Sequence, residues 1–327
     1  VVVWGEDGNI FWILLFLCGT FINSLALIKK ERPRKGRHKH KSKEAGPKMS
    51  IDYSYLDFNF HKHMVAGLAV VPQFLELLDS EMRMLIVGLG GGILPMFLYK
   101  HFPKLLVDVV ELDGAVAEIA KSCFDFVEDQ RMKVYIGDGL EYIGMLAEDS
   151  TGPTYHIVTF DIDAKDLSTG LNSPPRPFIE KAFLKKVDSI LHPQGVFMLN
   201  LISRDDTIKQ DVVNDIKTIF PLVYTKSGKD EVNETLYAIS RASRQKPLEC
   251  HSGETLTEGF DSACPCTTTK EQLPSRANES TLNLASDLLG RLPNYGKELQ
   301  KLAESTSKGL WDSDMDLSEI LGKLEIR

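Results

Sequence analysis

The sequence has 327 residues, 43% of them hydrophobic, which is enough for one large domain with additional segments. Its formal net charge of −8 disfavours a protein that grips nucleic-acid phosphates over its whole surface, so we expect no nucleic-acid partner. The five cysteines are scattered, and Cys264-Pro-Cys266 lacks both C-x-x-C spacing and nearby histidines, so we expect no metal site. Their odd number suits a reducing, cytoplasmic compartment. The chain begins with Val1 rather than methionine, as expected of a fragment or a processed chain.

Residues 1–48 combine an apolar run with a basic linker. The run at 10–28 (IFWILLFLCGTFINSLALI) carries no charge and is long enough to span a bilayer. The basic stretch at 29–41 would then keep the downstream chain on the cytoplasmic side. A cleaved signal peptide is disfavoured, because the acidic Glu6 and Asp7 precede the run. We favour a buried segment of a larger protein over a membrane anchor, and both interpretations place the remaining chain in the cytosol.

Residues 49–241 alternate between strand-like and helix-like segments. Apolar runs of strand length occur at 84–89, 105–112, 132–138, 156–163, 195–201, 221–226 and 234–240. Helix-like segments lie between them, for example at 114–124 and 174–191. This alternation predicts an α/β fold with a mostly parallel sheet covered by helices on both faces. Ligands of such sheets bind at the carboxyl ends of the strands, where the winding reverses.

The last part of the chain divides in two. Residues 242–280 are rich in Ser, Thr, Glu, Pro and Cys without periodicity, so we expect a flexible loop. Residues 281–327 contain the helical patterns LNLASDLLGRL and LSEILGKL, with Trp311 between them. We therefore expect a C-terminal helical segment.

Glycines gather directly after the first strand of the middle region. The segment reads Gly88-Leu89-Gly90-Gly91-Gly92. Bare backbone at this place lets the chain turn tightly and lie against a ligand that a Cβ would exclude. Such glycines also serve simply to pack a helix against a strand, and this alternative stays open.

The following strands end in acidic residues. Glu111 closes the second strand about twenty positions beyond the glycines, where an acid accepts hydrogen bonds from both ribose hydroxyls of a nucleoside. Asp138, followed by Gly139, closes the third strand and suits an adenine edge, and Asp161 closes the fourth. The same rim includes Asp113 and Asp163. A solvated acid at a strand end is the alternative for Glu111.

The pattern does not fit a phosphate ligand. Dinucleotide sites use G-x-G-x-x-G, whereas Ile93-Leu94-Pro95 follow the glycines here, and no P-loop lysine follows either. A carboxylate rim repels phosphates but suits a sulfonium cation. The sequence therefore favours S-adenosylmethionine as the cofactor, because it joins adenosine to a positive sulfur without any phosphate.

The segments VGLGGGILP, VELD, IGDGLEYI, FDIDAKD and HPQGVFMLNL resemble the spermidine-synthase-like branch of class I methyltransferases. The resemblance is closer to the C-terminal half of the methyltransferases that modify a lysine and the N terminus of elongation factor 1-alpha. It implies a Rossmann-like, mostly parallel seven-stranded sheet with its last pair antiparallel, within an S-adenosylmethionine-dependent methyltransferase domain at 49–241. It also implies a protein amine as acceptor, possibly on elongation factor 1-alpha, and that the N-terminal catalytic half of the family is absent from this chain.

Two departures separate this chain from the polyamine synthases of the same branch. Their glycine loop carries an aspartate, whereas GLGGG here has none, and His61-Lys62-His63 stand where those enzymes face a diamine. A diamine carries two positive charges, so losing a carboxylate and gaining Lys62 works against binding it. Methyl transfer is therefore favoured over aminopropyl transfer, and a non-catalytic cofactor-binding scaffold is the third alternative.

Methyl transfer to an amine needs positioning more than acid–base chemistry. The amine must be neutral to attack, so a carboxylate or histidine should orient it or accept its proton. We predict that Asp161 lies nearest the methyl group and that His61 or His63 assists. The structural alternatives are a loop-anchoring role for Asp161 and exposed positions for both histidines.

Overall fold

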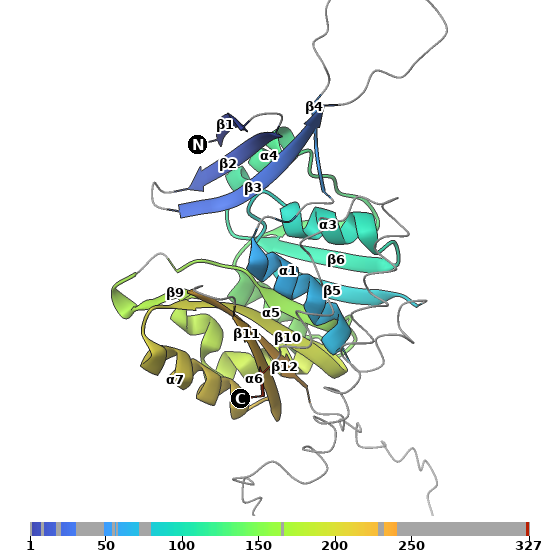
Figure 1. The fold of residues 1–327 in the computed structure, drawn as a ribbon. Coiled ribbons are helices and arrows are strands. Elements are labelled where there is room, and N and C mark those ends of the chain that lie inside the picture. Colours follow the sequence, from blue (N-terminus) through green and yellow to red (C-terminus); the bar gives the residue numbers. More distant parts are fainter. Residues whose placement is uncertain are drawn as a thin grey trace, which may run out of the picture.

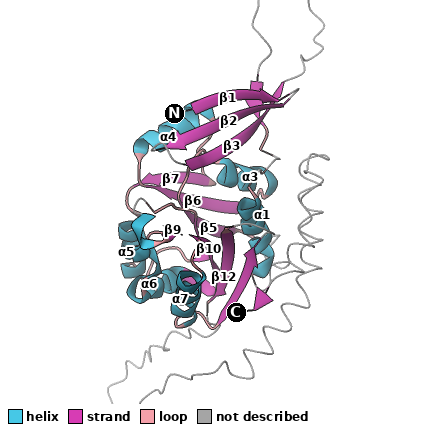
Figure 2. Cartoon of the chain, turned by 60° about the vertical axis from the view of Figure 1, so that its left-hand side comes forward, coloured by secondary structure: helices cyan, strands magenta, loops and turns pink. Residues whose placement is uncertain are grey.

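The computed structural model describes residues 2–7, 10–17, 21–30, 49–53, 56, 58–71, 80–164, 167–227, 232–240 and 325–326. Its centre is one large mixed sheet with helices on both faces (Figures 1 and 2). The strands of this sheet are β5 (Met82–Val87), β6 (Leu105–Glu111), β7 (Met132–Ile136), β8 (Tyr155–Phe160), β9 (Leu171–Ser173), β10 (Leu191–Ser203), β11 (Leu222–Ser227), β12 (Asn233–Ile239) and β13 (Glu325–Ile326). The helices are α1 (Asn59–Ala66), α3 (Ile93–His101), α4 (Gly114–Cys123), α5 (Gly139–Glu148), α6 (Lys181–Ile190) and α7 (Asp206–Lys217), with short 3₁₀ turns η1 (Gly67–Val70), η2 (Leu167–Thr169) and η3 (Arg176–Ile179).

The order of the strands confirms the predicted sheet. Seven strands run in the order β11-β12-β10-β8-β5-β6-β7, while β13 adds to the β11 edge and β9 pairs with β10. β7, β6, β5, β8 and β10 are parallel, whereas β12 is antiparallel to both β10 and β11. The winding reverses at β5, since β6 lies on one side of it and β8 on the other. The carboxyl ends of β5 and β8 therefore mark the place where a ligand is expected.

Alternate residues of the central strands enter two separate cores. Met84 and Ile86 of β5 pack with α1, α3 and α4 on one face. Leu85 and Val87 pack with α5, α6 and α7 on the other. Strands buried on both faces carry unbroken apolar runs, which explains the absence of polar alternation in this part of the sequence.

The described residues of the apolar run at 10–28 lie in two strands. β2 (Ile10–Leu17) and β3 (Phe21–Lys30) pair antiparallel with each other and with β1 (Val2–Asp7) and β4 (Met49–Ile51). This small sheet lies beside α3 and α4 (Figures 1 and 2). No helix in the described residues is long and apolar enough to cross a bilayer. The β-branched and aromatic residues of β2 and β3 favour such strands.

The small sheet also crosses the predicted boundary at residue 48, because β3 pairs with β4 in the register Ile28↔Ile51. The predicted loop at 242–280 lies outside the described residues. So does the predicted helical segment at 281–327, except for β13.

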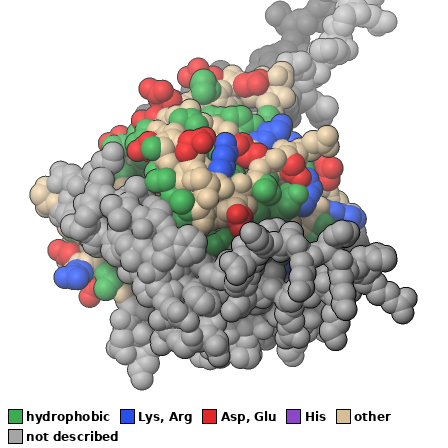
Figure 3. Space-filling view, turned by 90° about the horizontal axis from the view of Figure 1, so that it is seen from above, with side chains coloured by type: hydrophobic (Ala, Val, Ile, Leu, Met, Phe, Trp, Pro, Cys, Tyr) green, Lys and Arg blue, Asp and Glu red, His purple; other side chains and the backbone are tan. Residues whose placement is uncertain are grey.

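The described surface next to the small sheet carries mixed charge. Seen from that end, acidic side chains are interspersed with basic and apolar ones, and the described part shows no continuous basic stripe (Figure 3). This distribution agrees with the negative net charge of the sequence.

Candidate active site

Backbone hydrogen bonds join the ends of four neighbouring strands. The amide of Gly88 donates to the carbonyl of Val110, and that of Asp161 donates to the carbonyl of Val87, each at 2.9 Å. The amide of Gly137 donates to the carbonyl of Glu111 at the same distance. The glycine loop and the acidic strand ends predicted from the sequence therefore meet at one edge of the sheet, at the point where the winding reverses.

Packing within the chain accounts for two glycines of the loop. Gly88 has a φ of +102°, and a Cβ there would lie 2.1 Å from the carbonyl oxygen of Asp161. Gly92 has a φ of +74°, and its Cβ would lie 2.4 Å from the ring of Phe126. The packing alternative therefore explains these two positions without a ligand. Gly90, also at positive φ, and Gly91 remain the candidates for backbone that lies against a cofactor.

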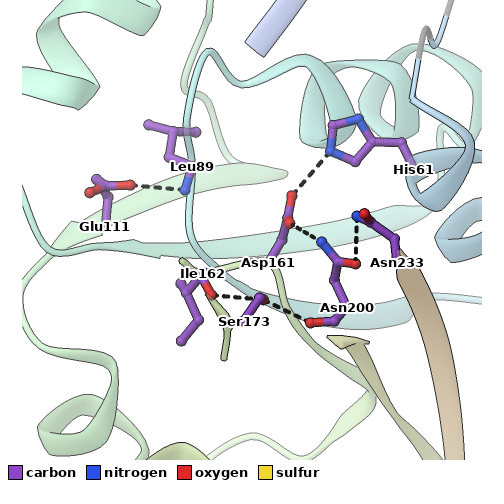
Figure 4. Close-up of polar contacts among 8 residues, drawn as sticks. All are labelled: His61, Leu89, Glu111, Asp161, Ile162, Ser173, Asn200 and Asn233. Atoms are coloured by element: carbon purple, nitrogen blue, oxygen red, sulfur yellow. Dashed lines mark hydrogen bonds and ion pairs between the residues drawn. The ribbon is translucent and has the colours of Figure 1, made fainter. Parts of the chain in front are cut away.

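Glu111 is held by the loop that it faces. Its Oε2 accepts the backbone amide of Leu89 at 2.9 Å (Figure 4). Its Oε1 accepts the backbone amide of Asp113 at 3.0 Å. Each carboxylate oxygen has a second lone pair, so two acceptor positions remain for ribose hydroxyls. The carboxylate is therefore fixed before any ligand binds.

Asp113 and Asp138 both cap helices. Asp113 accepts the amide of Ala115 at the start of α4, and Asp138 accepts the amide of Leu140 at the start of α5. A side-chain oxygen of this kind satisfies a backbone donor that the first helical turn leaves unpaired. Gly139 follows in α5, where a Cβ would lie 2.6 Å from Val87. The motif around Asp138 therefore has a local structural role, whatever it contributes to an adenine site.

Asp161 is partly exposed and lies at the meeting point of three elements. Nε2 of His61, from α1, donates to Oδ2 of Asp161 at 3.1 Å. The side-chain Nδ2 of Asn200, from β10, donates to Oδ1 of Asp161 at 3.3 Å (Figure 4). The side chain of Asp161 is 24% exposed, against 8% for His61. The structure thus brings Asp161 and His61 together, as the sequence predicted.

His63 does not join them. It is buried, its Nδ1 lies 3.5 Å from the hydroxyl of Thr235, and its carbonyl accepts the hydroxyl of Tyr237. Burial, with the positive charges of Lys226 and Lys62, lowers the pKa of His63 to about 4. The structural alternative, exposed positions for both histidines, is wrong, because α1 packs against the sheet and buries both side chains.

Asp163 faces outward beside Asp161. Desolvation by the surrounding protein and the negative charge of Asp161 raise the pKa of Asp163 to about 6, although the side chain remains exposed. The edge of the sheet therefore carries closely spaced acids, one of which is protonated more readily than an ordinary aspartate.

Sequence reasoning missed the polar residues behind Asp161 and the apolar residues beside Glu111. Asn200 interrupts an apolar strand, which is a signal in itself because Asn is uncommon in buried strands.

Leu112 and Ile136 lie at the ends of β6 and β7 and are 60% and 56% exposed. Large apolar side chains exposed beside a strand-end acid suit the flat face of a nucleobase.

Comparison with known proteins places this architecture in a family. A family model of the spermine/spermidine synthase domain matches residues 62–226, about half of the chain. The human eEF1A lysine and N-terminal methyltransferase is 42% identical over 249 residues, which cover 72% of this chain and 36% of that protein. The chain thus spans about a third of the length of these curated relatives.

Two further relatives cover parts of the chain. The crystal structure of human methyltransferase-like protein 13 in complex with SAH is 43% identical, covers 59% of this chain and 86% of that one, and has a TM-score of 0.54. A polyamine aminopropyltransferase from Vibrio vulnificus is 30% identical over 146 residues, which cover 45% of this chain and 44% of that enzyme. With the family model matching the whole region that carries the glycine loop, Glu111 and Asp161, the chain belongs to the spermine/spermidine synthase domain family.

Proposed function

We propose that this chain is a methyltransferase domain that uses S-adenosylmethionine to methylate an amine on a protein. The observation that carries the proposal is the convergence of the glycine loop, Glu111 and the Asp161–His61 pair at the point where the sheet reverses. Similarity to the eEF1A lysine and N-terminal methyltransferases supports elongation factor 1-alpha as the acceptor. The scattered thiols support a cytosolic place of action.

The residues at the edge fit the cofactor in three ways. The two remaining lone pairs of the Glu111 carboxylate suit the ribose hydroxyls. The exposed Leu112 and Ile136 suit the adenine ring, with Asp138 nearby at the end of β7. The backbone at Gly90 and Gly91 suits the amino-acid portion. When bound, S-adenosylmethionine supplies an electrophilic methyl group on a positively charged sulfur.

The role of Asp161 and His61 is to receive the acceptor amine. A protonated amine has no lone pair for attack, so it must lose a proton before the methyl group is transferred. Asp161 has acceptor positions beyond those used by His61 and Asn200, and its partial exposure makes them reachable. Asp161 therefore orients the amine and takes up the proton that it loses, and His61 holds the carboxylate in place. We assign His63 a packing role, because Thr235 and Tyr237 enclose it.

Aminopropyl transfer is the second candidate, because the family includes enzymes with that activity. A diamine needs carboxylates at both ends, and the glycine loop supplies none here. The two activities are separated by incubating the chain with methyl-labelled S-adenosylmethionine and purified elongation factor 1-alpha, and in parallel with decarboxylated S-adenosylmethionine and a diamine. Label on the protein supports methyl transfer. Formation of a longer polyamine would establish the alternative, and cofactor binding by calorimetry without either transfer would leave a non-catalytic cofactor-binding scaffold.

Two variants separate binding from turnover. Glu111→Ala removes two charge-assisted hydrogen bonds to the cofactor, each of order 1.5–3 kcal/mol before compensation by water. Affinity for S-adenosylmethionine should therefore fall by roughly tenfold to a hundredfold or more. Asp161→Ala should lose turnover while its affinity for the cofactor changes little. Equal losses of affinity in the two variants, measured by calorimetry, would contradict this division of roles.

A further inference from the structure

Asn200 is a buried amide in the middle of an apolar strand. It is 2% exposed and lies in β10 between Leu199 and Leu201, which are fully buried. We infer that Asn200 is a positioning residue for Asp161: it fixes the orientation of the carboxylate that receives the acceptor amine. The inference rests on the proposed function, because that function gives Asp161 its role.

Two hydrogen bonds set which way the Asn200 amide faces. Its Nδ2 donates to Oδ1 of Asp161 at 3.3 Å, and its Oδ1 accepts Nδ2 of Asn233 at 3.2 Å (Figure 4). If the amide turned by 180°, its oxygen would face the carboxylate and its NH₂ would face another NH₂. The contact with the carboxylate would then become repulsive, and the contact with Asn233 would be lost unless that amide turned as well. The carboxylate of Asp161, which only accepts, therefore sets the Asn200 side-chain amide with its NH₂ toward Asp161, and Asn233 of β12 donates to the oxygen on the other side.

The backbone under Asn200 is tied to the loop that follows Asp161. The hydroxyl of Ser173, on β9, lies 2.8 Å from the carbonyl of Asn200 and 2.9 Å from the carbonyl of Ile162 (Figure 4). Ser173 is fully buried. This hydroxyl connects β10 to the residue next to Asp161, so the donor and the carboxylate keep a constant separation.

The consequence is a carboxylate held on both of its oxygens. His61 occupies one lone pair of Oδ2 from α1, and Asn200 occupies one of Oδ1 from β10. Rotation about the Cβ–Cγ bond of Asp161 would break both contacts at once. With Asn200 removed, only His61 would remain, and the carboxylate could turn away from the amine. A misplacement of about 1 Å in such a group can cost about a hundredfold in rate.

Three variants test the inference. Asn200→Ala should lower turnover by about tenfold to a hundredfold and leave cofactor affinity within about twofold of the original. Asn200→Asp keeps the shape but places a second carboxylate against Asp161, so the pair should retain a proton to higher pH. The acidic limb of its pH–rate profile should shift upward by about one pH unit or more. Asn233→Ala should reproduce a weaker form of the Asn200→Ala effect. Asn214→Ala, an exposed asparagine on α7, is the matched control.

A purely structural role for Asn200 would give a different result. It would lower the melting temperature without moving the pH–rate profile, and that outcome, or full turnover in Asn200→Ala, would overturn the inference. If the unmodified chain transfers no methyl group, the proposed function fails. The hydrogen-bond network that joins Asn233, Asn200, Asp161 and His61 is then tested by NMR titration of the His61 ring. Its midpoint should rise in Asn200→Asp, because a negative charge is added beyond Asp161. An unchanged midpoint would refute the network independently of activity.

Discussion

His61 and His63 are both buried on α1, yet they have different surroundings. Successive residues of an α-helix are rotated by about 100°, so residues two apart point in nearly opposite directions. His61 therefore points to Asp161, while His63 contacts Thr235 of β12. Only one histidine of the His-Lys-His segment can reach the acceptor site from this helix.

The environment of His63 predicts an acid-sensitive fold. Its pKa is about 4 in the folded chain and about 6.5 in the unfolded one. Between these values the unfolded chain binds a proton that the folded chain does not, so the free energy of unfolding falls as pH falls. The loss should approach about 3 kcal/mol near pH 4. Urea denaturation at several pH values measures it.

The control for this effect is a second histidine. His63→Gln should show a shallower dependence of unfolding free energy on pH between about 4 and 6.5. His192→Gln changes an exposed ring that is the smaller cause of the lowered pKa of His156, after desolvation, so it should alter the slope much less than His63→Gln does. Identical slopes for His63→Gln and the unmodified chain would show that burial of His63 is not the cause.

At the scale of elements, the junction between β5 and α3 is decided by contact with β8. Gly88 approaches the backbone of Asp161 so closely that a methyl group has no space, and its positive φ is unfavourable for other residues. The same close approach places Asp161 beside the glycine loop. The geometry of the candidate site therefore depends directly on the packing of β5 against β8.

Gly88→Ala should consequently destabilise the fold by more than about 2 kcal/mol, because it combines a backbone clash with an unfavourable φ. Gly137→Ala offers a matched control, since a Cβ at Gly137 meets nothing within 4 Å and its change should stay within about 0.5 kcal/mol. Chemical denaturation compares the two. Similar stabilities would show that the loop adjusts to a side chain at Gly88.

At the scale of the whole molecule, the site depends on elements that are far apart in the chain. Asp161 is separated by a hundred residues from His61 and by 39 from Asn200. A ligand at this edge would contact several of these elements, so its binding should stabilise the entire folded sheet and not one loop.

The corresponding prediction concerns thermal stability. At about 100 times its dissociation constant, S-adenosylmethionine should add about 2.7 kcal/mol to the free energy of unfolding. For a domain of this size, that corresponds to a rise in melting temperature of roughly 5–10 °C. At the same ligand concentration, Glu111→Ala should show a smaller rise. An unchanged melting temperature in the unmodified chain, at concentrations that saturate related sites, would contradict cofactor binding.

Much of the architecture was readable from the sequence alone. Apolar runs at 84–89 and 105–112 predicted parallel strands, and the glycines and Glu111 predicted a nucleoside site at their ends. These features are local: burial on both faces requires a continuous apolar run, and a tight turn requires glycine. The apolar run at 10–28 was ambiguous for the same reason, since length and hydrophobicity alone do not distinguish paired strands from a spanning helix.

Only the tertiary structure decided how the predicted residues divide their roles. Gly88 and Gly92 are glycines because Asp161 and Phe126 lie against them, and these neighbours are distant in sequence. The pairing of β10 with β8 places the side-chain amide of Asn200 against Asp161. The orientation of α1 brings His61, and not His63, into contact with Asp161. Periodicity reports which face of an element is buried. Which side chain meets which depends on strand pairing and helix orientation, and these are set by the packing of the complete chain.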